Sequence, residues 1–114
     1  MEKVDAVAAL SALAQDNRLD VFRLLVRAGP QGMAAGEVAE ELGLAPNTLT
    51  FHFDRLRTAG LVNARRDGRS IIYAARFEAM NQLIAFLTEN CCGGVSCAPV
   101  SACNPVRKRV KVPA

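Results

Sequence analysis

Apolar residues follow a helical period through the first part of the chain. Within residues 5–14 they recur every three positions, which predicts a helix with a narrow packing stripe. That stripe consists of Val7, Leu10 and Leu13. Asp16 is expected to be the N-cap of a second helix, which Gly29-Pro30 ends. Apolar residues crowd most of the surface of this second helix, so we expect it to be central: Leu19, Val21, Phe22, Leu24, Leu25 and Val26.

Two short helices joined by a tight turn are predicted next. Residues 36–42 carry apolar side chains at helical spacing, and Gly43 suits the left-handed conformation that closes a helix. Pro46 suits the first turn of the following helix, which we expect to run to Ala59 and to stop at Gly60. Its inward-facing residues are expected to be Leu49, Phe53 and Leu56. This arrangement is typical of a helix-turn-helix.

The period then changes from helix to strand. Residues 61–66 and 69–74 are predicted to be strands, and Asp67-Gly68 between them is a strong hairpin signal. Residues 77–89 return to helical spacing, with one full apolar face. That face consists of Met80, Leu83, Ile84 and Leu87. A hairpin directly after a helix-turn-helix is a wing, so the predicted fold is mainly α with a β-hairpin, a winged helix-turn-helix.

Polar side chains cover the second helix of the predicted helix-turn-helix. Hydroxyl and amide groups near a helix N-terminus can reach base edges and phosphates in the major groove of DNA. The residues expected to be exposed there and to contact DNA are Asn47, Thr48, Thr50, His52 and Arg55. His52 is the only histidine of the chain, so no second imidazole can share a metal with it, and we expect it to lie close to DNA.

Arginines gather on the predicted wing. Arg65, Arg66 and Arg69 surround the turn, where guanidinium groups can follow the DNA backbone or enter the minor groove. The net charge of +3 permits nucleic-acid binding without demanding it. Each feature alone also fits a solvated surface, but helix, turn, polar helix and basic hairpin in this order are far more specific.

The composition narrows the class of protein. A chain of 114 residues with 51% hydrophobic and 22% charged residues is expected to be one globular domain. Its apolar stretches are too short to span a bilayer, and its N-terminus lacks the pattern of a signal peptide, so we expect a cytoplasmic protein. There is no nucleotide-binding loop and no nucleophile–base constellation, which argues against an enzyme or a thiol carrier.

The chain resembles the ArsR/SmtB family of metal-sensing winged-helix repressors over residues 7–90. The resemblance rests on Leu13-Ala14, Arg18-Leu19, Leu24-Leu25, Val38-Ala39, Leu42-Gly43-Leu44, Thr48 to Phe53, Leu56, Ala59 to Val62, Arg65-Arg66, Gly68-Arg69 and Tyr73. The family's serine–histidine–leucine signature corresponds here to Thr50, His52 and Phe53. The resemblance implies a homodimer, packed through the first and last helices, that binds an inverted-repeat operator and blocks transcription. We therefore expect residues 1–90 to form a DNA-binding and dimerisation domain and residues 91–114 a flexible, basic, cysteine-rich tail.

All four cysteines lie in that tail, and in a reducing compartment they should be thiols. Thiolates are soft ligands, and three of them suit a trigonal ion such as arsenite or antimonite. Cys91 and Cys92 supply two sulfurs if the backbone leaves helical geometry after Asn90. The glycine pair that follows lets the chain turn back, so that Cys97, or Cys103 in its place, supplies the third sulfur. Trivalent arsenic is thus the expected inducer, with no catalytic cofactor.

Other roles for these cysteines stay open at this point. Four thiolates could hold structural zinc, although the usual spacing is absent, or another soft metal. They could sense oxidants, or they could be incidental. Many arsenic sensors of the family carry cysteines before the recognition helix, and the matching residues 32–38 have none. Zinc sensors use Asp and His on the last helix, and residues 77–90 have neither. The chain resembles members with a vicinal cysteine pair after that helix, and if only this pair binds, a methylated trivalent arsenical is the better ligand.

Overall fold

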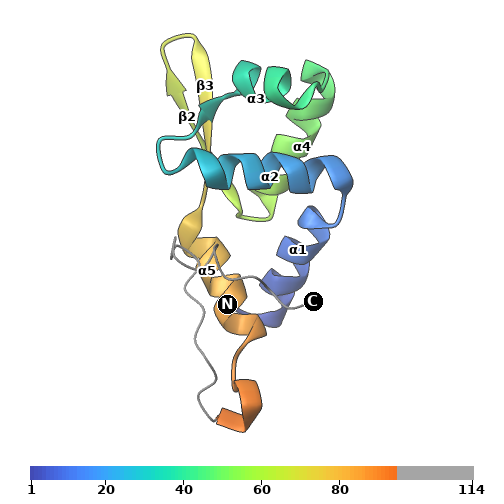
Figure 1. The fold of residues 1–114 in the computed structure, drawn as a ribbon, viewed down its shortest axis with the longest axis vertical. Helices are drawn as coiled ribbons and strands as arrows, with labels where there is room; N and C mark the ends of the chain where they lie inside the picture. The colour runs from blue at the N-terminus through green and yellow to red at the C-terminus, as the bar shows by residue number, and fades with distance from the viewer. Residues whose placement is uncertain (95–114) are drawn as a thin grey trace, which may run out of the picture.

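The computed structural model describes residues 1–94, so Cys97, Cys103 and the remainder of the predicted tail lie outside the described residues. The elements follow the order α1 (Lys3–Leu13), α2 (Asp16–Ala28), β1 (Met33–Ala34), α3 (Ala35–Leu42), α4 (Pro46–Thr58), β2 (Val62–Asp67), β3 (Ser70–Ala75), α5 (Phe77–Leu87) and η1 (Cys91–Gly94) (Figure 1). The predicted fold class, a winged helix-turn-helix that is mainly α with a β-hairpin, is confirmed. None of the helices in residues 1–94 is long and apolar enough to cross a membrane.

Helix α2 is central, as predicted. It crosses the middle of the molecule, with α3 and α4 on one side and α1 and α5 on the other (Figure 1). It buries Val21, Phe22, Leu24 and Leu25. Its N-cap is Gln15, whose side chain accepts a hydrogen bond from the backbone N–H of Arg18 at 2.9 Å. The prediction that Asp16 would be the cap was therefore wrong by one position, because the extended residue that precedes the helix is Gln15.

The sheet has three strands in the order β1-β3-β2. Strand β1 was not predicted, because two residues are too few to show an alternating pattern; it pairs with β3 through Met33↔Tyr73. The β2–β3 hairpin closes at Asp67↔Ser70, which leaves a two-residue loop whose Gly68 has a φ of 64°. The loop is thus one residue later than the predicted Asp67-Gly68 turn, and Gly68 supplies the positive φ that such hairpins need.

Close packing of β1 against β3 depends on Gly32. Its φ is 76°, and a Cβ atom at this position would collide with the carbonyl oxygen of Tyr73. A glycine here meets both requirements, because it adopts positive φ without strain and leaves room for the neighbouring strand.

Helices α1 and α5 lie side by side, and each has a second apolar face that residues 1–94 leave exposed (Figure 1). Ala6, Ala9 and Ala12 are the α1 residues that pack into the core. Of the predicted packing stripe, Leu13 packs against the core, whereas Val7 and Leu10 do not. These two side chains are 55% and 43% exposed, because the short alanines allow α1 to approach its neighbours closely.

Helix α5 repeats this arrangement. Leu83 is buried, whereas Ile84 and Leu87 are exposed. The helix ends at Leu87, earlier than the predicted residue 89, and the hydroxyl of Thr88 donates a hydrogen bond to the Ile84 carbonyl oxygen at 2.9 Å. Both helices therefore offer an uncovered apolar surface at the same end of the domain.

Candidate nucleic-acid interface and thiol site

The turn between α3 and α4 positions the first turn of α4. Gly43 closes α3 in the left-handed conformation, with a φ of 66°, and Pro46 is the first residue of α4, both as predicted. Four of the predicted DNA-contact residues on α4 are exposed: Asn47, Thr48, Thr50 and Arg55. The Thr50 hydroxyl donates to the Pro46 carbonyl oxygen at 3.0 Å, which leaves its lone pairs available as acceptors. The helix N-terminus beside them presents backbone N–H groups that favour phosphate.

His52 does not belong to this surface. Its side chain is only 4% exposed, so the prediction that it would be exposed near DNA was wrong. Leu49, His52, Phe53 and Leu56 form one inward stripe at helical spacing. Burial lowers the pKa of His52 below its ordinary value of 6.5, and the positive charge of Arg18 lowers this pKa further. Neither ring nitrogen has a hydrogen-bond partner within residues 1–94. The ring is therefore a neutral part of the core.

Phe51, which the sequence analysis did not select, lies on the outward face of α4. Its side chain is 50% exposed, and the Arg55 guanidinium carbon lies 4.9 Å from the centre of its ring. Thr48 is one turn earlier on the same face. The helical spacing alone could have found this residue, because Phe51 lies two positions from both Leu49 and Phe53, on the side opposite the inward stripe.

The three wing arginines differ in their surroundings. Arg65 and Arg66 are neighbours on β2, so their side chains leave opposite faces of the sheet. Arg65 donates through Nη2 to the carbonyl oxygen of Gln31 at 3.0 Å, which ties the wing to the α2–β1 loop. The side chains of Arg66 and Arg69 are exposed and make no hydrogen bond or ion pair within residues 1–94. The hairpin that carries them extends to the same end of the molecule as α3 and α4 (Figure 1).

The backbone leaves helical geometry directly after α5, as predicted. Asn90 and Cys92 have φ angles of 59° and 56°, in the left-handed region that residues other than glycine rarely adopt. This turn brings Cys91 Sγ to 3.5 Å from Cys92 Sγ. Since zinc–thiolate bonds are about 2.3 Å long, one soft ion of similar size can contact both sulfurs.

The oxidation state of Cys92 and the number of ligands within reach both bear on ligand binding at this site. Cys92 is disulfide-bonded in this structure, which differs from the expected thiol, so a ligand that needs its thiolate requires the reduced protein. Within residues 1–94 no group of three histidine, cysteine or acidic side chains could hold a metal ion. The predicted third ligands, Cys97 and Cys103, lie outside the described residues.

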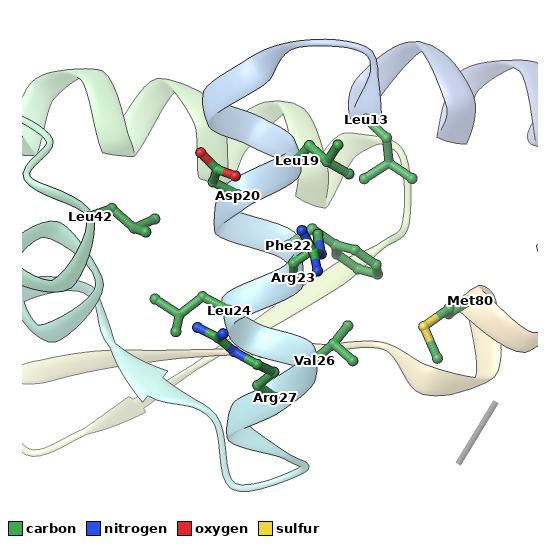
Figure 2. Close-up of a pocket in the computed structure, with 10 residues that line it drawn as sticks. All are labelled: Leu13, Leu19, Asp20, Phe22, Arg23, Leu24, Val26, Arg27, Leu42 and Met80. Carbon is green, nitrogen blue, oxygen red and sulfur yellow. The ribbon is translucent and has the colours of Figure 1, made fainter. Parts of the chain in front are cut away.

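A groove of about 510 Å³ runs along α2. Figure 2 shows that α2 supplies most of its labelled side chains, with Leu13 from α1, Leu42 from α3 and Met80 from α5. None of its lining residues is a predicted ligand of DNA or of arsenic. The groove therefore adds nothing to either site.

Comparison with known proteins places the chain among helix-turn-helix transcriptional regulators. Residues 13–65 match the model of a helix-turn-helix domain family. The chain is 34% identical over 87 residues to the HTH-type transcriptional regulator YgaV of Escherichia coli K12, covering 76% of this chain and 86% of that protein.

Solved structures show the same fold. The ArsR-like transcriptional regulator from Rhodococcus sp. RHA1 superposes with a TM-score of 0.66 at 24% identity, over 74% of this chain and 76% of that chain. The homodimeric winged helix-turn-helix DNA-binding domain of Mb0332 from Mycobacterium bovis, a possible ArsR-family regulator, superposes with a TM-score of 0.58 at 26% identity. That match covers 74% of this chain and 82% of that chain.

Proposed function

Because the chain belongs to the ArsR/SmtB-like family of winged helix-turn-helix transcriptional regulators, we propose that it is an arsenic-responsive repressor. In this proposal a homodimer holds an inverted-repeat operator and releases it when trivalent arsenic binds thiolates after α5. The observation that carries the proposal is the turn that places the sulfurs of Cys91 and Cys92 3.5 Å apart, directly after a helix with an uncovered apolar face.

The DNA-binding face combines two elements. The first turn of α4 presents Asn47 and Thr48 to base edges, and the backbone N–H groups beside them favour phosphate. Arg66 and Arg69 extend the contact along the DNA backbone from the wing. Both elements lie at one end of the domain (Figure 1). This division suits a recognition helix in the major groove that is flanked by a phosphate-binding hairpin.

The exposed apolar faces of α1 and α5 support the dimer. Val4, Val7 and Leu10 on α1 and Ile84 and Leu87 on α5 are all exposed. Two copies related by a two-fold axis bury such self-complementary surfaces against each other. The Mb0332 domain, which shares the fold, is homodimeric. A two-fold dimer presents its recognition helices about 34–36 Å apart, one turn of DNA, which fits an inverted repeat.

The position of the cysteine turn supplies a route from ligand to DNA. Cys91 lies four residues after Leu87, which is part of the proposed dimer surface. Arsenic held by Cys91 and Cys92, with Cys97 or Cys103 as a third ligand, reorders the chain at the end of α5. The relative orientation of the two subunits then changes, and operator affinity falls. Allosteric coupling of about 1–3 kcal/mol reduces affinity by a factor of about 5–150.

The proposal is tested by fluorescence anisotropy of the reduced full chain on an inverted-repeat duplex selected by the protein itself. Arsenite, antimonite and methylarsenite are added in separate titrations, and zinc is added as a comparison. We expect trivalent arsenic to release the wild-type protein, and Cys91→Ser and Cys92→Ser to keep DNA binding but lose the response. The variant Ser11→Ala, on α1, is the matched control. Release of the Cys92→Ser protein by arsenite would refute the site.

A second candidate, thiol-based redox sensing, is favoured by the disulfide at Cys92. In this case two thiols lose two electrons and two protons to an oxidant such as peroxide, and the resulting disulfide changes the end of α5. Addition of peroxide without metalloid distinguishes the two. If peroxide alone releases the DNA and reductant alone reverses this release, the protein is a redox sensor, and its assignment as a repressor is unchanged.

A further inference from the structure

The outward face of α4 carries an aromatic ring that neither the core nor phosphate binding explains. Phe51 is 50% exposed, whereas Phe53, two residues later, is 1% exposed. Transfer of an apolar ring of this size out of water is favourable, so an exposed ring is suited to a contact with a partner. Phe51 shares its face with Thr48 and Arg55, both of which belong to the proposed DNA surface. The ring therefore lies where the edges of the bases would meet it.

The neighbour of this ring is a cation whose hydrogen-bonding groups are not engaged. The guanidinium carbon of Arg55 lies 4.9 Å from the ring centre, within the range of a cation–π contact. The Arg55 guanidinium makes no ion pair or hydrogen bond within residues 1–94, and the acidic residue nearby, Asp54, pairs with Arg57 at 3.8 Å. The contact with Phe51 holds the guanidinium in place, and its N–H groups remain available to bind an acceptor.

We propose that Phe51 and Arg55 together read a thymine next to a guanine in each half-site. The major groove displays the C5-methyl group of thymine, which is an apolar partner for a ring, and O6 and N7 of guanine, which accept two hydrogen bonds from arginine. Successive bases rise by about 3.4 Å. A separation of 4.9 Å between the guanidinium carbon and the ring centre is compatible with contacts to adjacent base pairs. The inference rests on the proposed DNA-binding face, and it assigns a base-reading role to Phe51.

The test uses the reduced full chain without metalloid. Duplexes selected from a random pool by the wild-type protein are expected to contain a thymine–guanine neighbour in each half-site. Duplexes selected by Phe51→Ala are expected to keep the guanine and lose the preference for thymine. Replacement of that thymine by deoxyuridine removes only the methyl group, and it should weaken wild-type binding about fourfold, as expected for burial of one methyl.

Single-residue variants test whether Phe51 contacts the thymine methyl group and Arg55 the guanine. Phe51→Ala should bind the thymine and deoxyuridine duplexes equally, whereas Leu19→Ala, a control with a similarly exposed apolar side chain on α2, should discriminate between them as the wild type does. Replacement of the guanine by 7-deazaguanine should weaken the wild type and leave Arg55→Ala unaffected. Circular dichroism and sedimentation show whether each variant keeps its fold and its oligomeric state.

Each other outcome overturns the inference in a distinguishable way. If the wild type binds its selected operator but tolerates deoxyuridine at every thymine, the DNA-binding function stands and the role of Phe51 is wrong. If Phe51→Ala remains sensitive to deoxyuridine, or changes the oligomeric state, the ring belongs to a protein contact. If the wild type selects no duplex at all, the proposed function fails and the inference fails with it.

Discussion

The ring of Phe53 on α4 stacks on the ring of Tyr73 on β3, with centroids 3.6 Å apart and an interplanar angle of 7°. Both residues are buried, at 1% and 8% exposure. This contact joins the recognition helix to the base of the wing through side chains alone. It therefore fixes the relative placement of the two elements that we propose contact DNA.

Truncation of this contact should destabilise the fold. We expect Phe53→Ala to lower the free energy of unfolding by about 3–5 kcal/mol, because it removes a fully buried ring and leaves a cavity. Phe53→Leu keeps part of the apolar volume and should cost less. Urea unfolding of the reduced protein measures both variants. An equal loss from Phe53→Ala and from Phe51→Ala, whose ring is half-exposed, would contradict the distinction between these two residues.

The stability of the protein should fall as the pH falls through the range in which His52 titrates. Burial and Arg18 lower the pKa of His52 in the folded state, whereas in the unfolded state it stays near 6.5. Below that value the unfolded chain binds a proton that the folded chain excludes. The stability that neutral His52 provides is therefore present above the unfolded pKa and is lost as the pH falls toward the folded pKa.

His52 is the only histidine, which makes this prediction simple to isolate. Urea unfolding at about pH 7.5 and about pH 5.5, on either side of the ordinary histidine pKa, should show a larger loss of stability for the wild type than for His52→Leu. The substitution removes ring nitrogens that have no partner within residues 1–94. At the higher pH it should therefore change the free energy of unfolding very little. Equal losses for the two proteins would show that another group carries the pH dependence.

His52 and Phe51 show which features of α4 can be predicted from the sequence. Helical spacing predicted that Leu49, Phe53 and Leu56 face inward, and the structure agrees. The same spacing puts His52 with them and Phe51 opposite. The polarity of the imidazole favours exposure, and the prediction for His52 followed residue type rather than position, whereas no face was predicted for Phe51. In this helix geometry decided both cases.

Long-range and very short features could not be predicted in this way. The hydrogen bond from Arg65 to Gln31 joins residues 34 positions apart, and no local pattern encodes it. Strand β1 has two residues, fewer than an alternating pattern needs. On α1, the larger side chains of Val7 and Leu10 marked the predicted packing stripe, but alanines face the core, because close approach of neighbouring helices favours small residues. Each of these features depends on what lies opposite in the fold.

Two glycines give a matched pair of substitutions. Gly32→Ala should destabilise the protein by about 1–3 kcal/mol, because a Cβ atom would meet the Tyr73 carbonyl oxygen and the residue has a positive φ. Gly36→Ala, in α3 with open space around its Cα, should be neutral or stabilise by up to about 1 kcal/mol. Thermal unfolding compares the two. A stable Gly32→Ala protein would show that β1 can separate from β3 at little cost.

The three wing arginines should differ in how much each contributes to the salt dependence of operator binding. Arg66→Ala and Arg69→Ala should each weaken operator binding about equally for all sequences and reduce the slope of log affinity against log salt by about one. Arg65→Ala should change this slope less, because its guanidinium already bonds to the Gln31 carbonyl oxygen. Anisotropy titrations at several salt concentrations measure the slopes. If Arg65→Ala gives the largest change, that residue contacts phosphate in the complex.

The proposed dimer surface can be tested with two leucines of matched exposure. Leu10 on α1 is 43% exposed and Leu19 on α2 is 42% exposed, but only Leu10 lies on the apolar face that α1 and α5 leave uncovered. A carboxylate buried in an apolar interface has a high desolvation cost. Leu10→Glu should therefore give a monomer with native circular dichroism and weak operator binding, whereas Leu19→Glu should remain dimeric. Sedimentation equilibrium measures both. If Leu19→Glu dissociates and Leu10→Glu does not, the interface lies along the groove beside α2, and the effect of the cysteine turn on subunit orientation needs another route.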